Sequence, residues 1–113
     1  MCNEATLQTV LAEISQKAQE TFGGALESTI LFGSYARGDY DTQSDIDVMV
    51  LVNLPAGELS AHRGAVSAFS TDLDLQYGVF TSIKLQDLAT FEAWKDTLPF
   101  YRNILEEGVR VSA

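Results

Sequence analysis

Two aspartates, Asp45 and Asp47, lie two residues apart at the start of the apolar segment "DIDVMVLV". Alternate residues of a strand point to the same face, so these carboxylates project together with α-carbons about 6.6 Å apart. Like charges at the mouth of an apolar strand are unfavourable unless a cation or hydrogen bonds offset them. The spacing therefore predicts a metal site. A bare D-x-D is more often a solvated strand entrance, so the interpretation depends on what precedes it.

A glycine and a serine, Gly33 and Ser34, follow the short apolar segment "STILF". A glycine lets backbone N–H groups approach a phosphate, and a serine hydroxyl adds a hydrogen-bond donor. The intervening "SYARGDYDTQS" is too polar and short to be more than a loop with one or two helical turns. We predict that this loop holds phosphates while the two aspartates hold metal.

A third carboxylate is expected on a neighbouring strand. Two-metal nucleotidyl transfer places the cations about 3.5 to 4 Å apart, which takes two or three converging carboxylates. The segment "DLDLQYGVF", residues 72–80, alternates polar and apolar residues and predicts a half-buried third strand. Either Asp74 or Asp72 would then reach the site. We favour Asp74, because it lies deeper in the alternation and should be held more rigidly. Solvent-facing strand positions are the alternative interpretation of both.

Two other phosphate- or cation-binding motifs are each excluded by two positions. Residues 33–38 satisfy the first half of a P-loop, but Asp39 and Tyr40 stand where Lys and Ser/Thr are needed. The run "DYDTQSDIDVMV" begins like a calcium loop, yet Ser44 and Val50 occupy the positions that require Gly and Glu. The chain is therefore predicted to be neither a Walker-type ATPase nor an EF-hand protein.

The complete pattern resembles a known family. Gly33-Ser34, ten residues, then Asp45-Ile46-Asp47 is similar to the signature of the polymerase-β-like nucleotidyltransferase superfamily, and "GSYARG…SDIDVMV" looks most like its minimal members. The resemblance extends over about residues 26–80. It implies an α/β (α+β) fold, with a small mixed sheet flanked by helices, and a single minimal nucleotidyltransferase domain over residues 1–113.

The resemblance also implies a reaction and a set of roles. Members of this superfamily bind two Mg²⁺ ions, which Mn²⁺ can replace, and a nucleoside triphosphate whose α-phosphate is attacked by an acceptor hydroxyl with release of pyrophosphate. ATP is the expected nucleotide. Arg37 and Gly38 also match, as residues that stabilise the loop. The implied site consists of nucleotide-binding Gly33, Ser34 and Arg37, and metal-binding, catalytic Asp45, Asp47 and Asp74.

Minimal members of the superfamily often work with a separate helical HEPN-domain protein, in some cases as a toxin–antitoxin pair. The acceptor is therefore expected on, or presented by, such a partner. The alternative is a catalytically weak or vestigial nucleotide-binding module that acts as an antitoxin-like partner. Trp94, Phe100 and Tyr101 are interpreted as packing residues or as a partner-binding patch. Antibiotic nucleotidylation ranks low, since it usually needs an added substrate domain.

Composition limits the class of protein. The 113 residues suit one domain, and a formal charge of −9 should repel nucleic acid, so no extended nucleic-acid surface is expected. The only cysteine, Cys2, has no partner for a disulfide, and no apolar run approaches the roughly 20 residues of a membrane span. We expect a cytoplasmic protein without a membrane segment.

Helices and strands are predicted to alternate around this site. Asn3 is a candidate N-cap for an amphipathic helix over 4–21, and the apolar faces of "DIDVMVLV" indicate a strand in the middle of a sheet. His62 is expected on the surface. The remaining elements are a strand at 28–33, a helix over 57–70, the strand at 72–80, a helix over 85–95, and a C-terminal helix or tail closing at Gly108.

Overall fold

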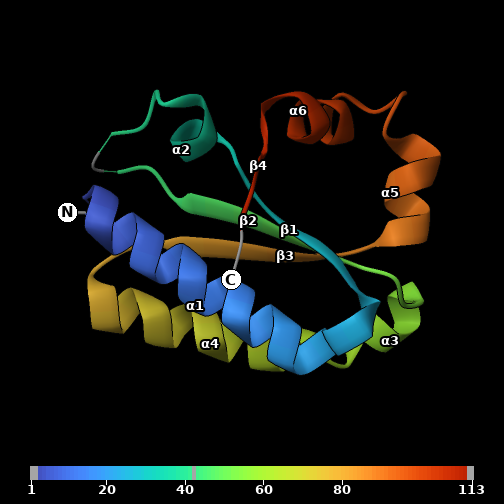
Figure 1. The fold of residues 1–113 in the computed structure, drawn as a ribbon, viewed down its shortest axis with the longest axis horizontal. Helices are drawn as coiled ribbons and strands as arrows, with labels where there is room; N and C mark the ends of the chain where they lie inside the picture. Colours follow the sequence, from blue (N-terminus) through green and yellow to red (C-terminus); the bar gives the residue numbers. More distant parts are fainter. Residues whose placement is uncertain (1–2, 42, 112–113) are drawn as a thin grey trace.

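A computed structural model describes residues 3–41 and 43–111 of the chain, so Cys2 lies outside the described residues. Within these ranges four strands form one sheet, and six α-helices are placed around it (Figure 1). In chain order the elements are α1 (Glu4–Phe22), the 3₁₀ turn η1 (Gly23–Ala25), β1 (Leu26–Phe32), α2 (Ser34–Arg37), β2 (Ile46–Val52), α3 (Ala56–Ser60), α4 (Arg63–Tyr77), β3 (Thr81–Asp87), α5 (Leu88–Trp94), α6 (Pro99–Glu107) and β4 (Val109–Arg110).

The sheet is mixed, in the order β3-β2-β1-β4. β1 runs antiparallel to β2 and to β4, whereas β2 and β3 are parallel and are joined by a crossover through α3 and α4. β2 is an interior strand, as its apolar residues predicted. The predicted α/β fold with a small mixed sheet flanked by helices is confirmed.

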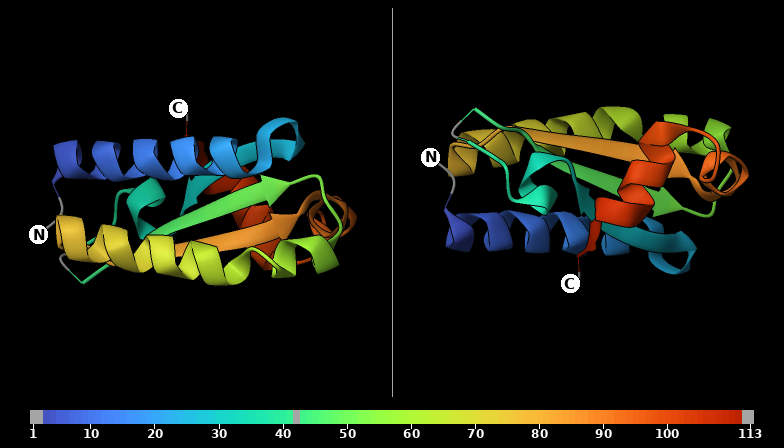
Figure 2. Two further views of the ribbon diagram at one scale, coloured as in Figure 1. Left: turned by 90° about the horizontal axis from the view of Figure 1, so that it is seen from below. Right: turned by 90° about the horizontal axis from the view of Figure 1, so that it is seen from above.

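The two faces of the sheet are covered differently. Helices α1 and α4 lie side by side across one face, while α2 and α6 lie over the other (Figure 2). Val48 and Val50 belong to the core beneath α1 and α4, whereas Met49 and Leu51 pack in a second cluster with Phe91 and Ile104. Since successive side chains alternate, Asp47 shares the face of Met49 and Leu51.

Helix α1 follows the sequence prediction closely. The Asn3 side chain caps it by accepting a hydrogen bond of 2.8 Å from the Thr6 N–H. Its buried residues recur at helical spacing and pack against the sheet: Leu7, Val10, Leu11, Ile14, Ser15, Ala18 and Phe22. No helix in residues 3–41 and 43–111 is long and apolar enough to cross a membrane.

The strand predicted at residues 72–80 is wrong. This segment is the second half of α4, and the third strand begins only at Thr81. Val66, Phe69 and Leu73 are spaced for one helix face that packs on the core, so helical periodicity overrides the local alternation. Gly78, at φ +66°, then ends the helix. The helix predicted over 85–95 accordingly starts only at Leu88.

Two leucines of α4 provide a matched test of this correction. Leu73 is 2% exposed and Leu75 is 80% exposed, although an alternating strand would place both on one buried face. We expect Leu73→Ala to destabilise the protein by about 2–4 kcal/mol, and Leu75→Ala to change the free energy of unfolding by less than about 0.5 kcal/mol. Urea denaturation followed by circular dichroism measures both. Equal losses in the two variants would contradict the helical assignment.

Candidate active site

The turn after β1 and the start of β2 meet at a single contact. Phe32, the last residue of β1, pairs with Asp47, which brings Gly33 against the Asp47 carboxylate. A Cβ atom at position 33 would overlap that carboxylate. Gly33 also has φ +75° and ψ −156°, a backbone conformation that essentially only glycine adopts. The structure thus brings together the Gly-Ser pair and the D-x-D pair that the sequence singled out.

Ser34 begins the single-turn helix α2, so the prediction of a loop with one or two helical turns is confirmed. Its backbone carbonyl accepts hydrogen bonds from the N–H groups of Gly38 and Asp39, at 2.9 and 3.2 Å. Within the described part of the chain, its half-buried hydroxyl has no hydrogen-bond partner. The hydroxyl is therefore available to a ligand.

Arg37 is the last residue of α2 and ties the loop to α6. Its guanidinium forms ion pairs with Asp39 at 3.2 Å and with Glu107 at 3.5 Å. The hydrogen bond to Asp39 and the charges of both carboxylates raise the pKa of Arg37. This arrangement matches the loop-stabilising role that the resemblance implied, and binding of Arg37 to nucleotide stays a prediction.

The two aspartates at the start of β2 differ in burial. Asp45 is exposed just before the strand, and Asp47 is half-buried as its second residue. Burial raises the pKa of the Asp47 carboxyl, and the neighbouring Asp45 carboxylate raises it further, while the charges of Lys84 and Arg37 oppose the rise. An oxygen-only pair of this kind suits a hard cation such as Mg²⁺, whose charge would offset the crowding.

The neighbouring strand β3 adds no carboxylate to this face. Ser82 lies in register with Asp47, and Lys84 lies in register with Met49. By strand alternation Ser82, Lys84 and Gln86 share the face of Asp47, while Ile83 and Leu85 pack toward α1 and α4. Within residues 3–41 and 43–111 there is no group of three or more His, Cys, Asp or Glu that could hold a metal ion.

Asp74 and Asp72 are on α4, not on a strand beside β2. The Asp74 carboxylate accepts hydrogen bonds of 2.8 Å from the N–H and from the hydroxyl of Thr81, and so fixes the first residue of β3. Thr81 belongs to the face covered by α4, and Asp72 is exposed to solvent. The proposal of either residue as third ligand therefore loses its basis, because it depended on the strand at 72–80. The helical spacing of Val66, Phe69 and Leu73 was the signal that would have shown this.

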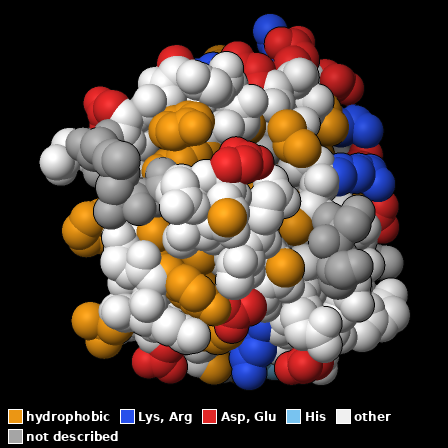
Figure 3. Space-filling view, turned by 60° about the vertical axis from the view of Figure 1, so that its left-hand side comes forward, with side chains coloured by type: hydrophobic (Ala, Val, Ile, Leu, Met, Phe, Trp, Pro, Cys, Tyr) orange, Lys and Arg blue, Asp and Glu red, His pale blue; other side chains and the backbone are white. Residues whose placement is uncertain are grey.

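Two exposed aromatic side chains lie in the segments that precede β2 and β3. Phe80 is 65% exposed, and its carbonyl accepts a hydrogen bond of 2.8 Å from the Ile46 N–H, which places Phe80 next to the start of β2. Tyr40 is 43% exposed and stacks on Tyr35 with ring centroids 4.3 Å apart. Figure 3, which brings the left-hand side of Figure 1 forward, shows hydrophobic patches separated by polar and acidic groups. Aromatic faces at such an edge can stack on a nucleotide base.

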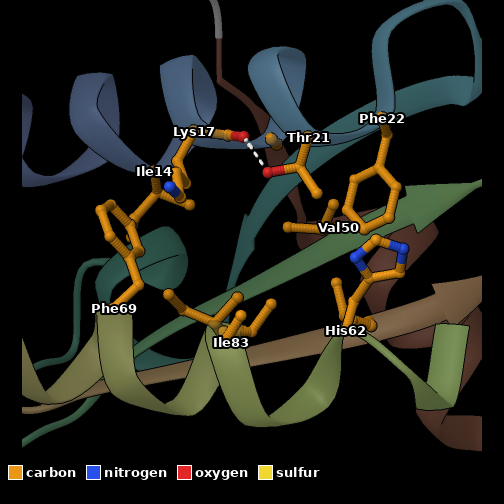
Figure 4. A pocket seen from close by; sticks show the side chains of 12 residues that line it. Ile14, Lys17, Thr21, Phe22, Val50, His62, Phe69 and Ile83 are labelled. Carbon is orange, nitrogen blue, oxygen red and sulfur yellow. Dashed lines mark hydrogen bonds between the residues drawn. The ribbon is translucent and has the colours of Figure 1, made fainter.

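An apolar pocket between α1 and α4 lies on the other face of the sheet (Figure 4). Its volume is about 40 Å³, and Val50 and Ile83 form its floor. His62, predicted on the surface, is half-buried here with its ring 5.0 Å from that of Phe22. The pocket is too small for a nucleotide and is separated from Asp47 by the sheet, so it is part of the core rather than of the active site.

The contact between Gly33 and Asp47 predicts a large effect of one methyl group. Gly33→Ala should destabilise the protein by about 3 kcal/mol or more, because it adds backbone strain and overlaps the Asp47 carboxylate. Gly38→Ala is the control: Gly38 also has a positive φ, of +85°, but a Cβ there meets no atom within 4 Å. Its cost should be about 1 kcal/mol, from strain alone. Thermal and urea denaturation measure the loss of stability in both variants. Adding Asp47→Ala to Gly33→Ala should restore part of the stability that Gly33→Ala loses, because it removes the overlapping carboxylate. Equal costs for the two glycines would contradict the contact.

The raised pKa of Asp47 predicts that removing its charge increases the stability of the protein in a pH-dependent way. Folding disfavours the ionised carboxylate, so this penalty is fully present above the folded-state pKa and disappears below the ordinary value of 3.8. In metal-free buffer, Asp47→Asn should therefore raise Tm at pH 7 by a few degrees, since about 1 kcal/mol shifts Tm by roughly 4 °C in a domain of this size. The gain should vanish near pH 3.5. An Asp47→Asn protein that is less stable at pH 7 would show that the carboxylate is not strained by its surroundings.

Comparisons with known proteins agree with this geometry. Residues 11–111 match the family described as "Nucleotidyltransferase domain". A Methanocaldococcus jannaschii protein named "Putative protein adenylyltransferase MJ0604" is 34% identical over 101 residues, which cover 89% of this chain and 93% of that protein. A second protein of that organism, "Putative protein adenylyltransferase MJ1305", is 44% identical over 62 residues, covering 54% of this chain and 42% of its own length.

Solved structures support the fold. A chain from the crystal structure of one mutant of the toxin-antitoxin MntA-HpeT superposes with a TM-score of 0.55 at 20% identity, covering 91% of this chain and 73% of that one. A chain from a second mutant of MntA-HpeT gives a TM-score of 0.51 at 20% identity, over 100% of this chain and 74% of that one. The match to the family over residues 11–111 and the relative at 34% identity establish what the Gly-Ser turn and the D-x-D pair indicated: this chain belongs to the nucleotidyltransferase domain family, and the predicted enzyme class is confirmed.

Proposed function

We propose that this protein is a magnesium-dependent nucleotidyltransferase that transfers adenylate from ATP to a hydroxyl on, or presented by, a small helical HEPN-type partner protein. It would act in the cytoplasm as a single minimal domain over residues 1–113. The observation that carries the proposal is the contact of Gly33 with the Asp47 carboxylate. Because of that contact a glycine turn and a pair of carboxylates lie side by side, close enough for one triphosphate to meet both.

The residues of this face divide the work between phosphate and cation. The open Ser34 hydroxyl and the backbone at Gly33 would bind phosphate oxygens, and Asp45 and Asp47 would hold Mg²⁺. When bound, the cation would neutralise charge on the α-phosphate and orient the attack. Arg37, held by Asp39 and Glu107, would keep the loop in place.

The reaction conserves atoms and charge without a further reactant. The acceptor hydroxyl oxygen forms a bond to the α-phosphorus, and the bond from that phosphorus to the oxygen bridging the α- and β-phosphates breaks. The electron pair leaves with pyrophosphate, and the hydroxyl proton is released to water. The products are an adenylylated acceptor and pyrophosphate.

A protein acceptor is supported by the relatives and by the surface. The relatives at 34% and 44% identity carry the name protein adenylyltransferase, and the solved structures of similar fold are toxin–antitoxin complexes. Trp94, Leu98 and Phe100 are 49%, 42% and 45% exposed around α5 and α6, and would suit contact with a helical partner. Tyr101, by contrast, packs edge-on to Phe91 and donates a hydrogen bond of 3.1 Å to Gln86, so it belongs to the core side of α6.

A second candidate function is favoured because, within the described residues, no third carboxylate joins Asp45 and Asp47. A nucleotide-binding module with little turnover, acting as an antitoxin-like partner, needs the fold and the partner surface but not a complete metal site. Binding of the partner that survives loss of both aspartates, and that needs no nucleotide, would support this alternative.

Calorimetry tests the nucleotide site without knowledge of the acceptor. We expect ATP with Mg²⁺ or Mn²⁺ to bind the protein, and Asp45→Asn/Asp47→Asn to abolish the metal-dependent heat, because both cation ligands lose their charge. Asp72→Asn is the matched control, since this exposed carboxylate lies on α4, away from the site. The HEPN-type partner would be obtained by co-purification from the native host. With that partner and ATP labelled at the α-phosphate, Asp45→Asn should also abolish label transfer.

Full label transfer by Asp45→Asn would refute the metal role of the aspartates. Binding of ATP without any transfer, in the presence of a partner that binds regardless of nucleotide, would favour the second candidate function. Unchanged circular dichroism in each variant serves as the control for folding.

A further inference from the structure

We propose that this site holds one divalent cation, between Asp45 and Asp47, and that the ammonium of Lys84 supplies the second positive charge to the triphosphate. The inference rests on the proposed function and departs from the expectation of two metal ions. It follows from which side chains β2 and its neighbours present on one face of the sheet.

The surroundings of Asp47 on this face follow from the strand register. On one side β1 contributes Phe32, and on the other β3 contributes Ser82 in register and Lys84 two residues further along. Two residues along a strand span about 6.6 Å, and neighbouring strands lie about 4.8 Å apart, so a lysine arm from position 84 can reach the site. The charge of Lys84 acts on Asp47, which agrees with that placement. No residue of β3 on this face is a carboxylate.

The protein's own charges on this face favour one cation over two, because a second ion would be held mainly by the triphosphate oxygens. Asp45 and Asp47 together neutralise one Mg²⁺. A second dication about 3.5–4 Å from the first would have no further carboxylate to offset it and would repel the first ion about four times as strongly as a pair of unit charges repel one another. Lys84 and Arg37 would add to that repulsion, since both already act on Asp47 as positive charges.

Lys84 also differs from the other cation near the site in being unpaired. Arg37 is held by Asp39 and Glu107, but Lys84 forms no ion pair within the described residues. A lysine ammonium binds phosphate as a compact point charge with three donors. An exposed, unpaired ammonium beside the carboxylates is therefore placed to contact a triphosphate that the cation holds.

The alternative for Lys84 is structural. β3 is an edge strand, and lysines on edge strands oppose pairing with other chains. A lysine with only that role would leave cation and nucleotide affinities unchanged when it is substituted. The two roles are therefore distinguished by measuring the affinity for the cation and the affinity for the nucleotide separately.

The stoichiometry of Mn²⁺ tests the proposal directly. We expect electron paramagnetic resonance of the protein saturated with a non-hydrolysable ATP analogue to give one Mn²⁺ per chain and the spectrum of a single ion. Lys84→Asp should add a second Mn²⁺ with a spin-coupled spectrum, because it supplies a third carboxylate. Asp45→Asn/Asp47→Asn should lose the ion.

Lys84→Gln should move two affinities in opposite directions. Bare Mn²⁺ should bind roughly three- to tenfold more tightly, since a repelling charge is removed. The ATP analogue should bind roughly tenfold more weakly, since a charged hydrogen bond to phosphate is lost. Lys17→Gln is the matched control, because Lys17 lies on α1 at the other face, with its ammonium over the Phe69 ring. It should change neither affinity.

Three results would overturn the proposal. Two Mn²⁺ ions per unsubstituted chain, with a coupled spectrum, would restore the two-ion site and leave the proposed function intact. Unchanged affinities in Lys84→Gln would assign Lys84 to the structural role. Absence of any nucleotide binding would overturn the proposed function together with this inference, and so is distinguishable from the other two.

Discussion

The close approach of Gly33 to the Asp47 carboxylate is the constraint on which the rest of the site depends. It is set by the antiparallel pairing of β1 with β2, since Phe32 and Asp47 are partners in that register. Position 33 must lack a side chain for two reasons. Its positive φ favours glycine, and a Cβ atom would overlap the Asp47 carboxylate. The apolar residues of β2 beyond Asp47 are buried, from Val48 at 0% to Leu51 at 4% exposure, so the strand that carries Asp47 is held rigidly.

The division of the sheet into two faces explains how a small domain can keep such a site. α1 and α4 bury one face, and the apolar residues of α1 complete that core. On the other face α5 and α6 pack through Phe91 and Ile104 in one cluster with Met49 and Leu51, further along β2 than Asp47. Asp47 is therefore only half-buried, enough for burial to raise its pKa but not enough to exclude a ligand. The face covered by α1 and α4 provides the larger core, and the opposite face carries Asp47 at the start of β2.

Sequence reasoning was strongest where chemistry and periodicity coincide. The Gly-Ser turn, the D-x-D pair, the helix capped by Asn3 and the interior position of β2 all follow from local patterns that the tertiary structure preserves. The prediction failed where an alternating, strand-like pattern overlaps with helical spacing. Residues 72–79 alternate as a strand would, but Val66, Phe69 and Leu73 continue a helix, and burial of that stripe decides the conformation. The true third strand carries only Ile83 and Leu85 on its apolar face, too weak a pattern for an edge strand to be recognised. Because the third carboxylate was assigned to the strand predicted at 72–80, that assignment was lost when the segment proved to be helical.

A chain of net charge −9 that binds a polyanionic nucleotide must reverse its field locally. In the proposed site three groups would do so: a cation on Asp45 and Asp47, the ammonium of Lys84, and the guanidinium of Arg37. Arg37 is already paired with Asp39 and Glu107, so in this proposal the cation and Lys84 would act on the ligand. Because two carboxylates cancel one dication, the positive charge seen by the phosphates depends on what β3 presents beside them. A lysine there adds charge without requiring a further ligand, whereas a carboxylate there would need a second ion to achieve the same field.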